Sequence, residues 1–272
     1  MTPTGDARTI EQYWSRNGLE QAILDALAAM GKATGRLTVD DLAPVDQFHG
    51  GGKATTERLA RLAALAPGMR VLDVGGGLGG PARTLAAQFG CRVTTIDVTE
   101  SYVRAATMLT ERLGLADRVR HQIGNALNLP FEGGTFDVVW TQNSGMNIAD
   151  KAQLYAGLHR VLRSGGLLAI QEPMAGPAQP PIFPLMWARE PSQSFLRAPA
   201  EMRALIERAG FRTRAWDDIT SETAGPPPGT AIPAHAVQRV IMGDAVEAIT
   251  RAGRQNREEG RIVMVQATFE RP

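Results

Sequence analysis

The chain has 272 residues, of which 43% are hydrophobic and 21% charged, an ordinary composition for a globular protein of one or two domains. Its 29 Lys and Arg residues nearly balance 28 Asp and Glu residues, so the charge gives no reason to expect a nucleic-acid partner. A single cysteine, Cys91, excludes an intramolecular disulfide and any multi-thiolate metal site, and we expect no metal. Without an apolar run of about 18 residues or a recognisable signal peptide, we expect a cytoplasmic protein with no membrane partner.

The first 50 residues carry helical periodicity and no strand pattern. Apolar and aromatic residues from Ile10 to Leu27 recur at roughly helical spacing, and a second amphipathic helix is predicted over residues 55–65. We therefore predict an N-terminal helical cap over residues 1–52, followed by a main domain over residues 53–272.

From residue 70 onward, predicted strands alternate with predicted helices. The strands are expected over residues 70–74, 92–97, 118–123, 136–141, 166–172, 211–216 and 262–269. The helices are expected over residues 79–89, 100–113, 151–162, 199–209 and 234–257. Strands separated by helices indicate βαβ units. The sequence thus predicts an α/β fold with a doubly wound, mostly parallel seven-stranded sheet and a helical insert before the last strand.

Two proline-rich stretches interrupt this alternation, at residues 173–194 and 221–233. Long irregular connections within a compact domain are usually lids or binding loops. We predict lid segments near residues 173–197 and 219–258, with Met186 and Trp187 in the first of them.

The clearest motif is a glycine-rich loop that follows the first predicted strand, with the sequence Asp73-Val74-Gly75-Gly76-Gly77-Leu78-Gly79-Gly80. Glycines let a ligand approach the main chain closely, and the helix that follows presents unpaired N–H groups. Asp97 ends the next strand, where a carboxylate can accept hydrogen bonds from both ribose hydroxyls of an adenosine cofactor. Loop and carboxylate together predict an adenosine cofactor without specifying which one.

The position of Asp73 favours one class of cofactor. An acidic group two residues before the first glycine would repel a pyrophosphate, but it suits a cofactor with an ammonium and a sulfonium group. The spacing of Gly75, Gly77 and Gly80 also satisfies the dinucleotide fingerprint. An NAD-dependent oxidoreductase therefore stays open as an alternative.

Residues 71–80, 92–98, 124–131, 136–142 and 160–172 resemble the class I S-adenosylmethionine-dependent methyltransferases, which have a Rossmann-like fold. Asp46-Gln47-Phe48-His49 and residues 136–142 are most similar to sarcosine/dimethylglycine methyltransferases, followed by ubiquinone/menaquinone-type small-molecule methyltransferases. The resemblance implies methyl transfer from S-adenosylmethionine to a small-molecule acceptor. The attacking atom of the acceptor (N, O or C) and the oligomeric state, including a homo-oligomer, are left open.

The resemblance also implies site residues. Those expected to bind the cofactor are Asp73, Gly75, Gly77, Gly79, Asp97, Val98, Asn125, Ala126, Gln142 and Asn143. Those expected to contact the substrate are Tyr13, Asn147, Met186, Trp187 and His235. His49 and Glu172 are candidates for a catalytic role, although no base is assigned. Arg251, Arg254, Arg257 and Arg261 are interpreted as a solvated helix face.

The chain departs from its relatives after Gln142. The sarcosine/dimethylglycine type has an acid and an imidazole where this chain has Asn143 and Asn147. This difference keeps a second alternative open, a methyltransferase fold with a non-methylating role such as a cyclase or a cofactor-binding subunit.

Overall fold

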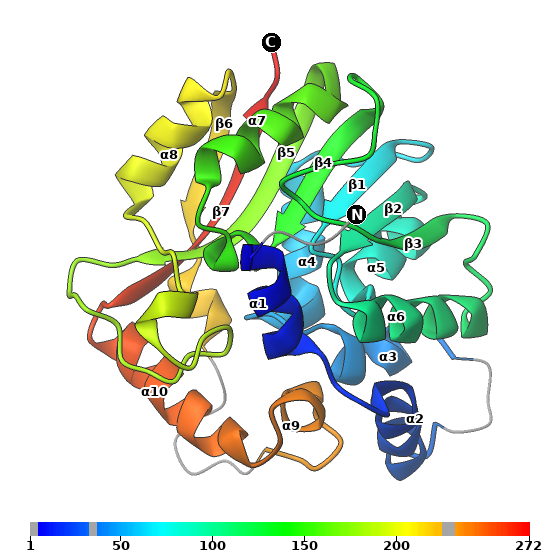
Figure 1. Ribbon diagram of the computed structural model, residues 1–272. Helices are drawn as coiled ribbons and strands as arrows, with labels where there is room; N and C mark the ends of the chain where they lie inside the picture. Colours follow the sequence, from blue (N-terminus) through cyan, green and yellow to red (C-terminus); the bar gives the residue numbers. More distant parts are fainter. Residues whose placement is uncertain (1–4, 33–36, 225–231) are drawn as a thin grey trace.

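A seven-stranded sheet forms the centre of the computed structural model, which describes residues 5–32, 37–224 and 232–272 (Figure 1). The strands are β1 (Arg70–Val74), β2 (Arg92–Asp97), β3 (Val119–Ile123), β4 (Phe136–Gln142), β5 (Leu162–Ala175), β6 (Arg212–Asp218) and β7 (Ile262–Glu270). Their order is β3-β2-β1-β4-β5-β7-β6, and β7 alone runs antiparallel to both its neighbours. The predicted seven-stranded, mostly parallel sheet is therefore confirmed.

Helices precede the sheet and cover both its faces. They are α1 (Gly5–Trp14), α2 (Leu19–Ala29), α3 (Val39–Asp46), α4 (Gly52–Leu62), α5 (Gly80–Phe89), α6 (Glu100–Arg112), α7 (Lys151–Val161), α8 (Pro199–Arg208), α9 (Val237–Met242) and α10 (Val246–Glu258). Short 3₁₀ helices lie at Gly145–Asn147, Pro191–Gln193, Thr220–Thr223 and Gly243–Ala245. The predicted helical insert before the last strand is α9 and α10.

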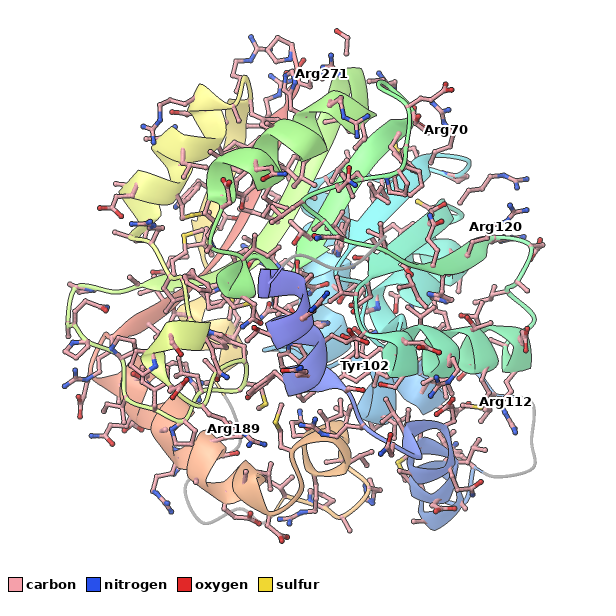
Figure 2. All side chains as sticks on the ribbon, in the orientation of Figure 1. Arg70, Tyr102, Arg112, Arg120, Arg189 and Arg271 are labelled. Atoms are coloured by element: carbon pink, nitrogen blue, oxygen red, sulfur yellow. The ribbon has the colours of Figure 1, made fainter. Side chains whose placement is uncertain are left out.

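Alternation along the strands determines the two faces of the sheet. Val71 packs with α4 and α5, whereas its neighbour Leu72 packs with α7 and α8, because successive strand residues point to opposite faces. Val138 and Val139 of β4 divide in the same way. Both faces are buried, which explains why these strands read as nearly continuous apolar runs. Charged side chains such as Arg70, Arg112 and Arg120 project from the surface (Figure 2).

Three elements differ clearly from their predicted bounds, and the first is α4, which covers residues 52–62 instead of 55–65. The helix predicted over residues 234–257 is wrong as a single element, because the chain breaks at Gly243, which has a φ of 55°. Strand β5 extends beyond residue 172 through Pro173, although proline cannot donate a backbone hydrogen bond. The ladder with β4 ends at Gln171, so Pro173 pairs with β7 alone.

The N-terminal helices pack on the domain through a shared apolar cluster. Leu19, Ile23 and Leu42 contact side chains of α6, α9 and α10 in this cluster. A buried ion pair adds a polar anchor, because Nη2 of Arg83 on α5 lies 2.8 Å from Oδ2 of Asp46 on α3. The domain boundary at residue 52 stays a prediction, and residues 225–231 of the second predicted lid lie outside the described residues. Within the described ranges, no helix has the length and apolar character needed to cross a membrane.

Candidate functional site

A cavity of about 660 Å³ opens at the carboxyl ends of the parallel strands. Its wall includes residues 74–78, which follow β1, and residues 142–144 at the end of β4. These two strands are neighbours whose connections leave in opposite directions along the sheet, and ligands bind at such switch points in open α/β sheets. The volume lies within the range of about 300–1,000 Å³ that is usual for small-molecule sites.

The glycine loop brings the main chain to the cavity wall. Gly75 and Gly77 have φ angles of 77° and 51°, a left-handed conformation that side chains other than glycine rarely adopt. A Cβ on Gly75 would lie 2.3 Å from Cβ of Ser144, so the two loops approach too closely for any side chain there. A Cβ on Gly77 would find its nearest neighbour at 4.0 Å, on the Tyr102 ring. The loop is thus tightly packed at Gly75 and open toward the cavity at Gly77.

Asp97 lines the cavity at the end of β2 and is held by main-chain donors. Its Oδ2 accepts a hydrogen bond from the Gly77 N–H at 2.9 Å, and its Oδ1 accepts one from the Thr99 N–H at 2.8 Å. Burial raises the pKa of Asp97 above its ordinary value, while these N–H groups act in the opposite direction. The carboxylate is therefore fixed in orientation and still reaches the cavity.

Asp73 lies two residues before the loop and is buried, with 2% of its surface exposed. Burial, together with the nearby charge of Asp97, raises its pKa to about 7. Its Oδ2 has no hydrogen-bond partner among the described residues. A buried carboxyl oxygen without a donor is costly unless another group satisfies it.

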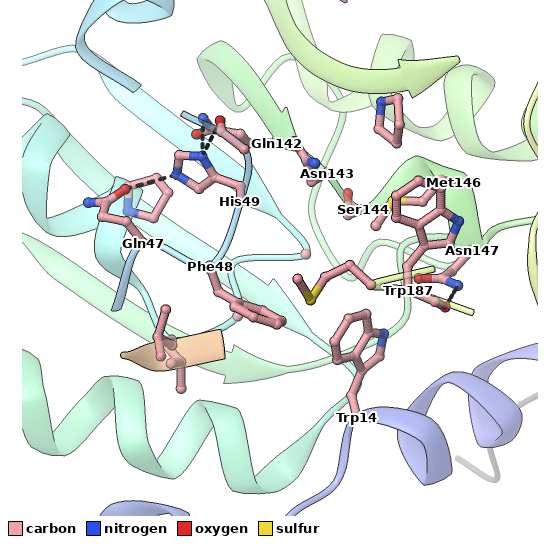
Figure 3. Close-up of a pocket in the computed structure, with 18 of the residues that line it drawn as sticks. Trp14, Gln47, Phe48, His49, Gln142, Asn143, Ser144, Met146, Asn147 and Trp187 are labelled. Carbon is pink, nitrogen blue, oxygen red and sulfur yellow. Dashed lines mark hydrogen bonds between the residues drawn. The ribbon is translucent and has the colours of Figure 1, made fainter. Parts of the chain in front are cut away.

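His49 belongs to a network of amide side chains at the cavity wall (Figure 3). Its Nε2 lies 2.9 Å from Oε1 of Gln47, and its Nδ1 lies 3.2 Å from Nε2 of Gln142. Gln142 also donates to Oε1 of Gln171 at 3.1 Å. Burial lowers the pKa of His49 to about 4, so the ring is neutral near pH 7. One consistent assignment has Nε2–H donating to Gln47 and Nδ1 accepting from Gln142.

Aromatic and Met side chains line the rest of the wall. Figure 3 shows Trp14 and Phe48 facing the same space as Trp187, and the Trp14 and Phe48 rings meet edge to face with centroids 5.7 Å apart. The amide of Asn147 donates to the carbonyl oxygens of Trp187, at 2.8 Å, and Gln193, at 3.0 Å. Asn147 thereby attaches the segment after β5 to the loop after β4. This part of the cavity suits an apolar ligand.

Many of the predicted site residues meet at this cavity. Those that line it are Gly75, Gly77, Asp97, Val98, Asn125, Ala126, Gln142 and Asn143 from the cofactor set, Asn147, Met186 and Trp187 from the substrate set, and His49. They come from four strand ends, the segment after α3 and the segment after β5. Their roles toward a ligand stay predictions.

Five predicted residues are absent from the described lining: Asp73, Gly79, Tyr13, His235 and, discussed below, Glu172. Asp73 is buried, as described above, and a Cβ on Gly79 would meet His121 and Arg83. The Tyr13 hydroxyl donates to the Met186 carbonyl at 3.0 Å, which joins α1 to the segment after β5. His235 lies in the turn before α9, beside lining residues 233 and 236–238.

Glu172 lies behind the loop that follows β4. Its Oε1 accepts hydrogen bonds from the Gly145 N–H at 2.8 Å and the Thr141 hydroxyl at 3.2 Å. Its Oε2 has no partner among the described residues. Lys151 lies nearby on α7, and its ammonium group donates to the Gly145 carbonyl at 2.6 Å. In this position Glu172 supports the loop from outside the cavity.

Sequence reasoning missed several lining residues. Trp14 lines the cavity in place of its neighbour Tyr13, and Phe48 lines it beside His49. Arg257 also lines it, so including this residue in a solvated helix face was wrong. The helical spacing of Trp14 and Arg257 was visible in the sequence, but spacing alone does not determine which neighbour a helix face meets.

Comparisons with known proteins agree with this geometry. Residues 72–170 match the model of the methyltransferase domain family. The glycine/sarcosine/dimethylglycine N-methyltransferase of Actinopolyspora halophila is 32% identical over 132 residues, which cover 48% of this chain and 23% of that protein. Methyltransferase GfsG of Streptomyces halstedii is 29% identical over 208 residues, 75% of this chain and 74% of that protein. The aligned region thus spans about a quarter of the first relative and three quarters of the second.

A solved structure has the same fold over the whole chain. The geranyl diphosphate C-methyltransferase from Streptomyces coelicolor superposes with a TM-score of 0.74 at 19% identity, covering 100% of both chains. The matched domain, its relatives and this fold agree with the glycine loop and acidic strand ends described above. Residues 72–170 thus match a methyltransferase domain, and the chain is similar to class I S-adenosylmethionine-dependent methyltransferases.

Proposed function

We propose that this protein transfers a methyl group from S-adenosylmethionine to a small, largely apolar acceptor. The observation that carries the proposal is the arrangement of the glycine loop and Asp97 around one cavity at the switch point of the sheet. Its relatives are named as methyltransferases, which supports methyl transfer over the oxidoreductase alternative.

The residues present fit the cofactor at both of its polar ends. Asp97 reaches the cavity with a fixed carboxylate, which suits the ribose hydroxyls. Asp73 has a buried oxygen without a donor beneath the glycine loop, and an ammonium group reached through a water would satisfy it. Asn125 and Ala126 line the cavity beyond β3, where the adenine would lie. When bound, S-adenosylmethionine supplies an electrophilic methyl group.

The aromatic wall is the proposed acceptor side. Trp14, Phe48 and Trp187 give this side of the cavity an apolar wall, and Met186 also lines the cavity. An acceptor bound against this wall is desolvated and held near the glycine loop. Positioning and desolvation of this kind can supply much of the acceleration of a displacement reaction.

Neither candidate base is free to take a proton from the acceptor. Both ring nitrogens of His49 are engaged by amide groups, and Glu172 supports the loop after β4 from outside the cavity. We assign His49 as a positioning residue that fixes the Gln142 side chain. The cavity therefore suits an acceptor atom that is nucleophilic without proton removal.

Methyl transfer is tested with S-adenosylmethionine labelled on its methyl group and a library of small-molecule acceptors. The expected result is labelled product with an equal amount of S-adenosylhomocysteine from at least one apolar acceptor. Binding of S-adenosylhomocysteine without turnover of any acceptor would instead favour the non-methylating alternative.

A further inference from the structure

One face of α10 presents an arginine side chain to the cavity. Ile249, Gly253 and Arg257 are spaced four residues apart, so they lie on one face of the helix, and all three line the cavity. A Cβ on Gly253 would lie 3.7 Å from Nη1 of Arg257, an ordinary contact distance, so the guanidinium lies beside Gly253. The guanidinium thus lies along the helix face that borders the cavity.

No hydrogen bond or ion pair with the described residues engages this guanidinium. Its electrostatic neighbours are Arg254, which repels it, and Glu258, the next residue in the chain. Burial and the Arg254 charge lower the pKa of Arg257, which means that the surroundings disfavour its cation. Glu258 offsets this effect only in part, so the partly buried cation would be stabilised by a bound anion.

The acidic residues of the cavity do not compensate Arg257. Asp46 is paired with the buried Arg83 of α5, whose Nη2 lies 2.8 Å from Oδ2 of Asp46. Asp97 ends β2, whereas α10 leads directly into β7, and these strands are four spacings apart in the sheet. Four spacings correspond to about 19 Å along the sheet edge.

Two further donors line the cavity from the same helical insert. The Gln238 amide on α9 and the Thr250 hydroxyl on α10 have no hydrogen-bond partner in the described part of the chain. Thr250 and Arg257 are seven residues apart, which places them on the same side of α10. The wall beside them is apolar, with Ile262 and Met264 from the start of β7.

We infer that the methyl acceptor is an amphiphile whose anionic group, a carboxylate or a phosphate, is bound by Arg257 while its apolar part lies against the aromatic wall. This inference rests on the proposed function, since it names the acceptor class for that cavity. A planar guanidinium can hold either anion through two parallel hydrogen bonds. The anion would then fix which end of the acceptor points toward the glycine loop.

The test compares three ligands with the same ten-carbon chain: decyl phosphate, decanoate and 1-decanol. Each is titrated below its micelle concentration into protein saturated with S-adenosylhomocysteine, and binding is followed by the fluorescence of Trp14 and Trp187, which line the cavity. At least one anionic ligand should bind about tenfold more tightly than the alcohol. The ratio between phosphate and carboxylate identifies the preferred anion.

Arg257→Gln is expected to remove this preference, so that the anions bind only as tightly as the alcohol. Arg251→Gln is the matched control, because it removes the same charge from an exposed position on the same helix. It should leave all three affinities unchanged. Equal binding of the alcohol and both anions, an unchanged preference in Arg257→Gln, or no saturable binding of any of the three would overturn the inference.

The cofactor titration keeps this test separate from the proposed function. Arg257→Gln should bind S-adenosylhomocysteine as the unaltered protein does, because Arg257 lies far from Asp97. If the unaltered protein failed to bind S-adenosylhomocysteine, the proposed function would fail. The amphiphile titrations on the free protein would still measure anion selectivity.

Discussion

Oδ2 of Asp97 accepts a hydrogen bond from the backbone N–H of Gly77 at 2.9 Å, which joins the end of β2 to the glycine loop. One carboxylate thus holds the loop in shape and faces the cavity. The structure of the loop and the proposed recognition of the cofactor ribose depend on the same side chain.

Asp97→Ala should weaken the binding of S-adenosylhomocysteine by about 1.5–3 kcal/mol, because a charge-assisted hydrogen bond to the ribose is lost. Calorimetric titration of the variant measures this change. Asp117→Ala is the control, since Asp117 is exposed in the turn before β3 and lies outside the cavity lining. An unchanged dissociation constant in Asp97→Ala would contradict the assignment.

Gly75→Ala should destabilise the protein by more than about 1 kcal/mol and weaken cofactor binding. An alanine at position 75 would have to adopt a positive φ, and its Cβ would lie only 2.3 Å from Cβ of Ser144. Gly114→Ala separates the cost of the positive φ from the cost of the collision. Gly114 has a similar φ of 67°, and a Cβ there would have nothing within 4 Å. Urea unfolding should show a clearly larger loss for Gly75→Ala. Equal losses would mean that the close approach of the two loops is unimportant.

Asp73→Asn should change how stability depends on pH. The pKa of Asp73 is about 7 in the folded protein, against an ordinary value of 3.8 that applies to the unfolded chain. The folded state therefore holds this proton more tightly, and wild-type stability should fall as the pH rises from about 4 to about 7. The asparagine variant lacks this decrease. Its free energy of unfolding relative to the wild type should therefore increase by up to about 4 kcal/mol as the pH rises over this range. Urea unfolding at pH 5 and pH 8 measures the difference, and a pH-independent difference would refute the prediction.

His49 should remain neutral between pH 5 and pH 8. Burial lowers its pKa to about 4, so its imidazole resonances should not titrate between pH 8 and pH 5. Two-dimensional NMR of the ring nitrogens tests this, with His49→Gln used to assign the signals. A midpoint near the ordinary value of 6.5 would show that the imidazole is accessible to water and available as a base.

The strand positions were predictable because parallel strands are covered on both faces and therefore form short apolar runs. The glycine loop and Asp97 were predictable because their chemistry depends on spacing within one βα unit. The positions of Trp14 and Arg257 were not, since helical periodicity does not determine the rotation of α1 and α10 against the sheet. Glu172 was assigned from its place at a strand end, but residues 143–147 lie between it and the cavity.

Calorimetric titration of the full chain with S-adenosylhomocysteine, and separately with NADH, tests the central claim most directly. The arrangement of Asp73, Gly77 and Asp97 predicts saturable 1:1 binding of S-adenosylhomocysteine and weaker or no binding of NADH. Tighter binding of NADH, or no saturable heat with S-adenosylhomocysteine at high micromolar concentration, would contradict the account.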